Sequence, residues 1–142
     1  MSTSTTIYPS ADANLRENAA DTNYSGNVAM RAGDYTTYRR HAVFMFDVSA
    51  ITATADIVSA TISFTYSGGS GTPRNMKLAR LNQDFVESEV TWNEASAGVA
   101  WTGGAGGEGN GEFTQPVYDI SVGFGLSGAT ADIRDLVQDA IA

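Results

Sequence analysis

Alternation of apolar and polar residues is the dominant pattern along the chain. Residues 56–67 alternate cleanly, which predicts a strand with one exposed face. Residues 39–49 carry apolar side chains on both alternating sets and predict a central strand covered on both faces. Residues 74–81 alternate again after the glycine-rich stretch 68–73. We therefore expect 56–67 and 74–81 to pair as a hairpin with a long tip.

Shorter elements complete the pattern. Apolar residues at helical spacing occur near the C-terminus and predict a short helix over residues 132–142. Strands are predicted at 6–9, 13–17, 27–33 and 115–122, and a glycine-rich loop at 101–113. Many short strands separated by turn residues are typical of sandwiches. The sequence predicts one all-β domain over residues 1–142, an antiparallel β-sandwich or jelly roll.

The charge of the chain excludes several classes of partner. The formal net charge is −8, with only 8 lysines and arginines among 142 residues. Binding to phosphates needs clustered basic residues, so we expect neither nucleic acid nor an anionic membrane as a partner. Polyanionic sugars are repelled for the same reason. The N-terminal residues "MSTSTTIYPS" lack the features of a Sec signal peptide, so we expect synthesis in a host cytoplasm without export.

Catalytic chemistry has two candidate locations. Glu87, Glu89 and Glu94 flank a tryptophan, and paired carboxylates cleave glycosidic bonds. We interpret this segment as a loop held by its apolar residues, and the chain as a protein without enzymatic activity. The single histidine, His41, is interpreted as a hydrogen-bonded strand residue. With no cysteine and no second histidine, a transition-metal site is not expected.

An oxygen-rich segment near the N-terminus offers ligands for a hard cation. The candidate calcium ligands are Asp12, Asn14, Glu17 and Asp21. The alternative is that these side chains make turn and cap hydrogen bonds. No other cofactor is expected.

Aromatic side chains in polar, glycine-rich segments are candidates for sugar binding, because pyranose faces stack on aromatic rings. The candidates are Tyr24, Tyr35, Tyr38 and Trp101. The alternative is that they fill the rim of the sandwich core.

Several segments in a fixed order resemble a known family. They are "DANLRE" (12–17), "DTNYSGN" (21–27), "RRHAVFMFDVSAI" (39–51), "ADIVSATISFTY" (55–66), "DFVESEVTWNEA" (84–95) and "ADIRDLVQDAI" (131–141). In these the chain resembles the DNRLRE-type domain, which is related to disaggregatase repeats and to some carbohydrate-binding modules. The resemblance implies an antiparallel β-sandwich that binds rather than catalyses, with alginate among the ligand types. Family members usually continue into one or two further strands, so an open sheet edge suited to assembly is expected here.

Two functions follow as alternatives. The first is a bacteriophage capsid decoration or cement protein on the virion surface, which binds the major capsid protein, most simply as a homodimer or trimer. The second is a stand-alone carbohydrate-binding module that uses its tyrosine and tryptophan side chains on neutral sugars. An enzyme using the Glu87–Glu94 cluster ranks third.

Overall fold

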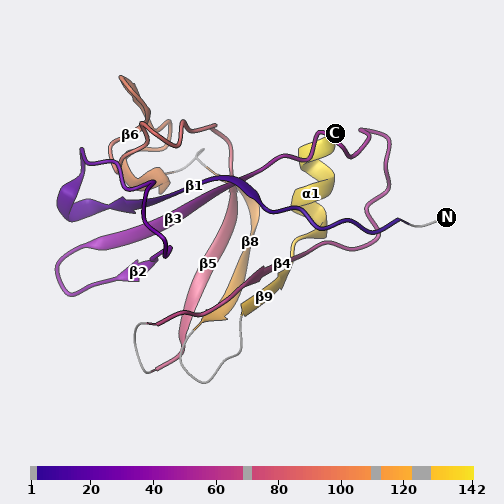
Figure 1. Cartoon of the computed structure of the whole chain (residues 1–142), viewed down its shortest axis with the longest axis horizontal. Helices are drawn as coiled ribbons and strands as arrows, with labels where there is room; N and C mark the ends of the chain where they lie inside the picture. The colour runs from indigo at the N-terminus through magenta and orange to yellow at the C-terminus, as the bar shows by residue number, and fades with distance from the viewer. Residues whose placement is uncertain (1–2, 69–71, 110–112, 123–128) are drawn as a thin grey trace.

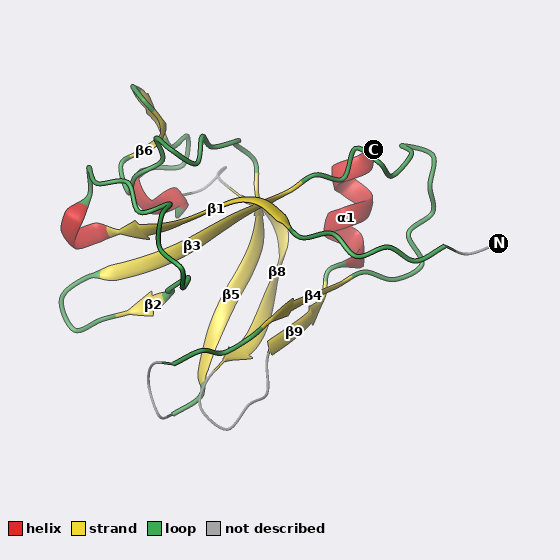
Figure 2. Ribbon diagram, in the orientation of Figure 1, coloured by secondary structure: helices red, strands yellow, loops and turns green. Residues whose placement is uncertain are grey.

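The computed structural model describes residues 3–68, 72–109, 113–122 and 129–142. Antiparallel strands and one short C-terminal helix make an all-β sandwich, which confirms the predicted fold class (Figures 1 and 2). The residues that lead into the first strand and the C-terminal helix lie on the same side of the molecule (Figure 1).

The first sheet contains β1 (Pro9–Arg16), β3 (Arg39–Phe46) and β2 (Gly33–Asp34), in the order β1-β3-β2. The two short strands predicted at 6–9 and 13–17 are in fact the single strand β1, preceded by residues without regular structure. The strand predicted at 27–33 is wrong, since only Gly33 is in a strand. The buried amide of Asn14 provides the reason. It donates to the Ala29 carbonyl (3.2 Å) and accepts from the Arg31 amide (2.5 Å), so the segment bonds to a side chain.

The predicted hairpin of 56–67 with 74–81 is also wrong. Strand β4 (Thr61–Phe64) pairs with β9 (Ala129–Asp132), and β5 (Arg74–Leu81) pairs with β8 (Phe113–Val122). Alternation shows which side chains share a face, but it carries no information about which strand lies alongside. A hairpin that was not predicted joins β6 (Glu94–Ser96) to β7 (Val99–Ala100).

The C-terminal helix α1 (Arg134–Ile141) confirms the helical prediction and buries Leu136 and Ile141. It lies beside the long connection between β3 and β4 (Figure 2). Gln138 joins the two, because its side chain accepts from the Ile57 amide (2.9 Å) and donates to the Ala55 carbonyl (3.1 Å). Two 3-10 turns, η1 (Glu17–Ala19) and η2 (Ala105–Gly107), complete the elements. Among the described residues no helix has the length and apolar character needed to cross a membrane.

Two groups of buried apolar residues make up the core. One lies between the β1–β3 sheet and the 85–101 segment, and consists of Ala13, Leu15, Val43, Phe85, Val90, Trp92, Ala95 and Trp101. Of the apolar residues expected to hold that segment, Phe85, Val90 and Trp92 are buried, whereas Val86 is 45% exposed. The other group is centred on Ile120 and Ala131, between the β5–β8 and β4–β9 pairs. The rings of Phe44 and Phe64 meet at 5.4 Å and connect the first sheet to β4.

Candidate functional site

Strands β1 and β3 present two chemically different faces. Ala13 and Leu15 of β1 point into the core, so Asn14 and Arg16, which alternate with them, lie on the opposite face. Arg16 is directly opposite Arg40 in the antiparallel register. Residues opposite each other on adjacent strands have their Cβ atoms about 5 Å apart on the same face. Two arginines are therefore side by side at the end of this face.

Each of these arginines covers a tyrosine. The Arg16 guanidinium lies 3.7 Å from the centre of the Tyr24 ring. The Arg40 guanidinium lies 4.5 Å from the Tyr35 ring and 5.2 Å from the Tyr38 ring. These five residues are called the tyrosine–arginine surface below. Cations over aromatic faces are attracted by the ring quadrupole, which fixes both partners in place.

Tyr35 and Tyr38 belong to the turn that joins β2 to β3. The Tyr35 amide donates to the Tyr38 carbonyl (2.8 Å), and the two rings stack at 4.9 Å with an angle of 5° between their planes. The Tyr38 hydroxyl accepts from Nη2 of Arg40 (2.9 Å). Tyr35 leaves 44% of its surface exposed. The turn therefore holds a pair of parallel rings at the edge of the sheet, with one of them open to solvent.

The arginines of this surface have hydrogen-bonding capacity left over. Arg40 is only 9% exposed, yet its Nε and Nη1 atoms have no hydrogen-bond partner among the residues that the structure describes, and neither does the buried Nε of Arg16. Buried polar groups in proteins are nearly always hydrogen-bonded. Like charges directly opposite each other on adjacent strands are also unfavourable. An anionic group bound near both arginines would relieve both costs.

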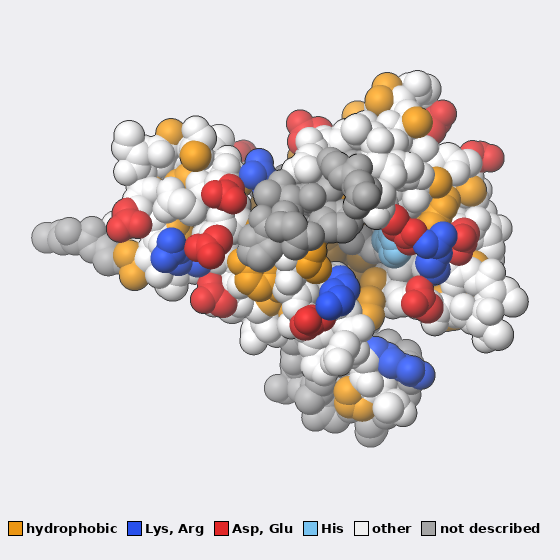
Figure 3. Space-filling view, turned by 180° about the vertical axis from the view of Figure 1, so that it is seen from behind, with side chains coloured by type: hydrophobic (Ala, Val, Ile, Leu, Met, Phe, Trp, Pro, Cys, Tyr) orange, Lys and Arg blue, Asp and Glu red, His pale blue; other side chains and the backbone are white. Residues whose placement is uncertain are grey.

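A cleft of about 2050 Å³ opens beside this surface. The residues that line it include the apolar side chains of Phe44, Ile62 and Leu78 as well as Arg40 and His41. Seen from behind, the molecule has a hollow with hydrophobic side chains inside and mixed charges around the histidine (Figure 3). Tyr35 also lines the cleft. An extended ligand could thus touch the exposed ring and the arginine rim together.

Of the four aromatic residues proposed for sugar binding, the structure brings together three. Tyr24, Tyr35 and Tyr38 are all members of the tyrosine–arginine surface. The expectation for Trp101 was wrong, because it is 3% exposed and packs in the core on the opposite face of the β1–β3 sheet. Its indole N–H donates to the Thr91 carbonyl (3.1 Å), which meets the polar requirement of a buried tryptophan.

The four candidate calcium ligands do not meet at one point. Asn14 is fully buried and bonded to the 29–31 loop, as described above. Glu17 accepts three hydrogen bonds from Arg39, and the Asp21 carboxylate accepts from the Asn93 side chain (2.7 Å). Asp12 uses its amide to bond Glu87. Within the described ranges no three His, Asp or Glu side chains are grouped to hold a metal ion. Calcium binding stays a prediction from sequence.

A charged cluster occupies the core side of β3, opposite the tyrosine–arginine surface. Arg39 pairs with Glu17 at 2.8 Å and also with Glu108. Hydrogen bonds from the Arg39 side chain and backbone hold the pKa of Glu17 below its ordinary value. The hydrogen bond to Glu17 and the charges of Glu108 and Glu17 in turn raise the pKa of Arg39. His41 contacts Glu108 and the Gly106 carbonyl, and its ring tilts against Trp92 at a centre-to-centre distance of 4.9 Å. The interpretation of His41 as a hydrogen-bonded strand residue is confirmed.

The three glutamates considered for catalysis each bond a backbone amide. Glu87 accepts from Asp12 (2.9 Å), Glu89 from Ala97 (3.0 Å), and Glu94 from Gly98 (3.1 Å). These contacts fasten the 85–98 segment to β1 and close the β6–β7 turn. The structure thus gives every one of these carboxylates a structural role.

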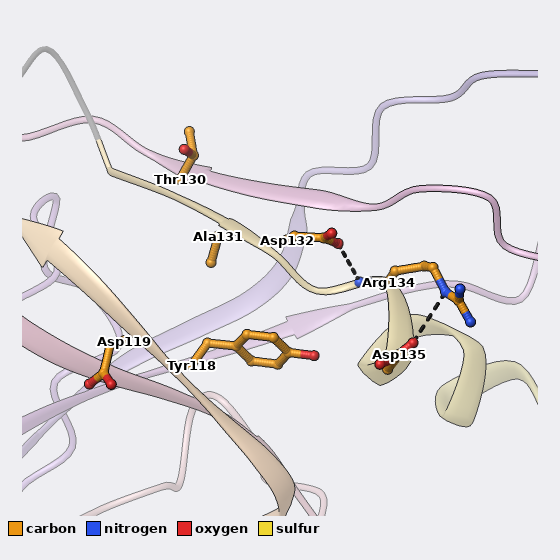
Figure 4. A pocket seen from close by; sticks show the side chains of 7 residues that line it. All are labelled: Tyr118, Asp119, Thr130, Ala131, Asp132, Arg134 and Asp135. Carbon is orange, nitrogen blue, oxygen red and sulfur yellow. Dashed lines mark hydrogen bonds and ion pairs between the residues drawn. The ribbon is translucent and has the colours of Figure 1, made fainter.

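A smaller pocket of about 470 Å³ lies between β8, β9 and the start of α1 (Figure 4). Tyr118 points its ring toward the helix, where Asp132 and Asp135 lie, and Asp119 lines the pocket further back on β8 (Figure 4). Partial burial, together with the carboxylates of Asp135 and Asp132, raises the pKa of Tyr118. The Asp132 carboxylate accepts from the Arg134 amide (3.0 Å), and Asp135 pairs with the Arg134 side chain (3.1 Å). This pocket is acidic, the opposite of the tyrosine–arginine surface.

Sequence reasoning missed Arg16 and Arg40. Both stood in segments assigned to strands, and alternation alone does not place residue 16 beside residue 40. The spacing of Tyr35, Tyr38 and Arg40 was an available signal, since an arginine two positions after a turn tyrosine lies on the same strand face as that tyrosine. The register of β1 on β3 was needed to complete the surface.

Comparison with family models supplies the family. The model of carbohydrate-binding module family 96 matches residues 3–110, which includes all of β1, β2 and β3 and the whole tyrosine–arginine surface. Comparison with curated proteins and with solved structures gave no match. Carbohydrate-binding modules are generally non-catalytic domains, in keeping with the structural roles of the three glutamates. With 108 of its 142 residues matched, the chain belongs to carbohydrate-binding module family 96.

Proposed function

We propose that this protein is a non-catalytic glycan-binding module and that its ligand lies on the tyrosine–arginine surface, with Tyr35 as the stacking ring. The observation that carries this proposal is the exposed Tyr35 ring, stacked on Tyr38 beside the facing arginines Arg16 and Arg40, whose buried Nε atoms have no hydrogen-bond partner among the described residues. The family supports carbohydrate as the ligand class. This surface, more than any other described feature, combines exposed aromatic area with unused hydrogen-bond donors.

The two arginines favour a sugar that carries a carboxylate. A guanidinium binds a carboxylate through paired N–H donors, and such charge-assisted bonds are stronger than neutral ones. Nε and Nη1 of Arg40 are donors without an acceptor in the described part of the chain, so a carboxylate placed beside this guanidinium would add favourable interactions. A neutral sugar would leave the like charges of Arg16 and Arg40 uncompensated. The local arrangement therefore opposes the expectation of a neutral sugar drawn from the net charge of −8.

Calorimetric titration with paired ligands tests the proposal. Oligosaccharides of uronic acids and neutral oligosaccharides of equal length are titrated into the wild-type protein and into Tyr35→Ala and Arg40→Met. We expect the uronic ligand to bind more tightly, and both variants to lose at least tenfold in affinity. Tyr8→Ala is the matched control, because Tyr8 is 79% exposed and lies outside this surface. Equal losses in Tyr8→Ala and Tyr35→Ala, or no binding to any oligosaccharide, would overturn the proposal.

The capsid decoration role is the other function expected from the sequence. The family match supports the carbohydrate-binding alternative instead. A major capsid protein partner, a homodimer or trimer and a place on the virion surface therefore remain predictions from sequence. Co-purification with phage particles at a fixed ratio is the measurement that checks them.

A further inference from the structure

The positive charge of this chain is concentrated in one place. Of its 8 lysines and arginines, five line the cleft beside the tyrosine–arginine surface, whereas only three of its 16 acidic residues do. The basic residues of the cleft are Arg31, Arg40, Arg74, Lys77 and Arg80, and the acidic ones are Asp34, Asp84 and Glu108. Basic side chains lie around the hydrophobic hollow in Figure 3. The cleft is thus net positive in a protein whose formal net charge is −8.

The arginines of the cleft are not used in ion pairs with described residues. Lys77 pairs with Asp119 across β5 and β8 (2.5 Å), but no described carboxylate forms an ion pair with any of the four cleft arginines. Outside the cleft, Arg39 and Arg134 both have carboxylate partners. The fold therefore pairs arginines elsewhere and leaves those of the cleft available to an anionic ligand.

These arginines are spread along the cleft. Arg40 belongs to β3, whereas Arg74 and Arg80 belong to β5, a strand of a different sheet. A strand rises about 3.3 Å per residue, so Arg74 and Arg80 lie roughly 20 Å apart along β5. Apolar side chains such as Leu78 line the cleft as well and offer surface to the C–H faces of sugar rings. The spacing suits a chain of several sugar residues better than a single one.

We infer that the cleft extends the tyrosine–arginine surface: it binds the acidic sugar chain beyond the ring stacked on Tyr35, and it makes the module select long chains over short fragments. This inference rests on the proposed function. A cleft lined by charge of one sign raises the local concentration of a ligand of the opposite sign. Each guanidinium can bind a carboxylate through paired N–H donors. A short fragment held at Tyr35 and Arg40 reaches fewer of these groups than a long chain does.

The acidic remainder of the surface sharpens this selection. Most acidic residues lie outside the cleft, so a polyanion is repelled from the rest of the molecule and attracted only where the arginines gather. The net charge of −8 thus directs an acidic chain to the cleft. Because the cleft charges are partly exposed, added salt should weaken their attraction.

Calorimetric titration with uronic oligosaccharides of increasing length tests the inference. In the wild-type protein, affinity should rise from the disaccharide to the hexasaccharide, and this gain should shrink as the salt concentration is raised. Arg74→Gln and Arg80→Gln should each lower the affinity for the hexasaccharide roughly fivefold, and that for the disaccharide by less. Tyr35→Ala should weaken binding at every length. Thermal melts followed by circular dichroism show whether each variant is folded.

Arg134→Gln is the matched control, because it removes the same charge from a residue outside the cleft and should bind the hexasaccharide like wild type. Three results would overturn the inference while leaving the proposed function intact. They are equal affinity for short and long chains, equal losses at both lengths in Arg74→Gln and Arg80→Gln, and a loss of the same size in Arg134→Gln. If no oligosaccharide of any length binds, the proposed function fails and this inference fails with it.

Discussion

Arg16 and Arg40 lie directly opposite each other on adjacent antiparallel strands, and no described carboxylate pairs with either guanidinium. Neighbouring Arg39, by contrast, points to the other face and pairs with two glutamates. Arg39 and Arg40, which are consecutive in β3, thus have different roles. Arg39 is paired with carboxylates of the fold, whereas two N–H donors of Arg40 have no acceptor among the described residues.

The first prediction separates those two arginines. Arg40→Met should leave the free energy of unfolding within about 1 kcal/mol of wild type, because removing a buried charge that pairs with no described carboxylate offsets the loss of its hydrogen bond to Tyr38. It should still lower the affinity for the uronic ligand at least tenfold. Arg39→Met should do the reverse, losing about 1 kcal/mol of stability with the ion pairs while keeping affinity. Urea unfolding and calorimetry measure the two effects. A large loss of stability in Arg40→Met would show that the fold itself requires the guanidinium.

Trp101 should behave as a core residue. Trp101→Ala should lower the free energy of unfolding by about 3 to 5 kcal/mol, since it leaves a cavity and an unsatisfied Thr91 carbonyl. Trp101→Phe, which keeps most of the ring volume, should lose less. Chemical denaturation followed by circular dichroism gives both values. If Trp101→Ala were as stable as wild type but failed to bind sugar, the indole would belong to a binding site after all.

Gly106 should tolerate no side chain. Its φ is +81°, and a Cβ would lie 2.7 Å from the Trp92 ring. Gly98 has a similar φ of +73° with nothing within 4 Å, so it is the matched control. Gly98→Ala should lose about 1 kcal/mol from the backbone conformation alone. Gly106→Ala adds the clash and should lose about 2 to 4 kcal/mol in the same denaturation assay. Equal losses would mean that the turn moves away from Trp92 at no cost.

The ion pair of Glu17 makes stability depend on acidity. Its pKa is held below the ordinary value of 4.5, chiefly by hydrogen bonds from the Arg39 side chain. A carboxyl whose pKa is lowered by folding contributes stability above its unfolded pKa and loses that contribution as the pH falls through the folded value. The melting temperatures of wild type and Glu17→Gln should thus differ at pH 7 and converge below about pH 4.5.

Asp84→Asn provides the control for that experiment, because Asp84 is an exposed acidic residue. It should melt close to wild type across the whole range. If the difference in melting temperature between wild type and Glu17→Gln increased as the pH was lowered, the predicted direction of the pH dependence would be wrong.

The local elements were accessible from sequence because they depend on local periodicity. Strands at 39–49 and 74–81 and the C-terminal helix appear where the pattern placed them. The pairing of β4 with β9 was not accessible, since its partners are about 70 positions apart and alternation is indifferent to the choice of neighbour. The strand prediction for residues 27–33 failed for another reason. The buried side-chain amide of Asn14 bonds to the backbone of this segment and outweighs its strand propensity.

The candidate site was likewise predictable from the sequence only in its local features. Tyr24, Tyr35 and Tyr38 could be selected by residue type and by their polar, glycine-rich context. Trp101 has the same context, yet it is buried, because exposure depends on what packs above a loop. The arginines became visible only through the register of β1 on β3, which is a long-range property.

The strand pairing also governs how this module can be transplanted. The family match ends at residue 110, whereas β5 takes β8 as its partner and β4 takes β9, both beyond that point. A graft cut at the end of the match would carry the whole tyrosine–arginine surface but leave two strands with bare edges, which invite aggregation. Anyone fusing this family 96 module to an enzyme should therefore transfer residues 113–142 with it. The proposed binding surface and the strands that cover the edges of β4 and β5 thus come from different parts of the chain.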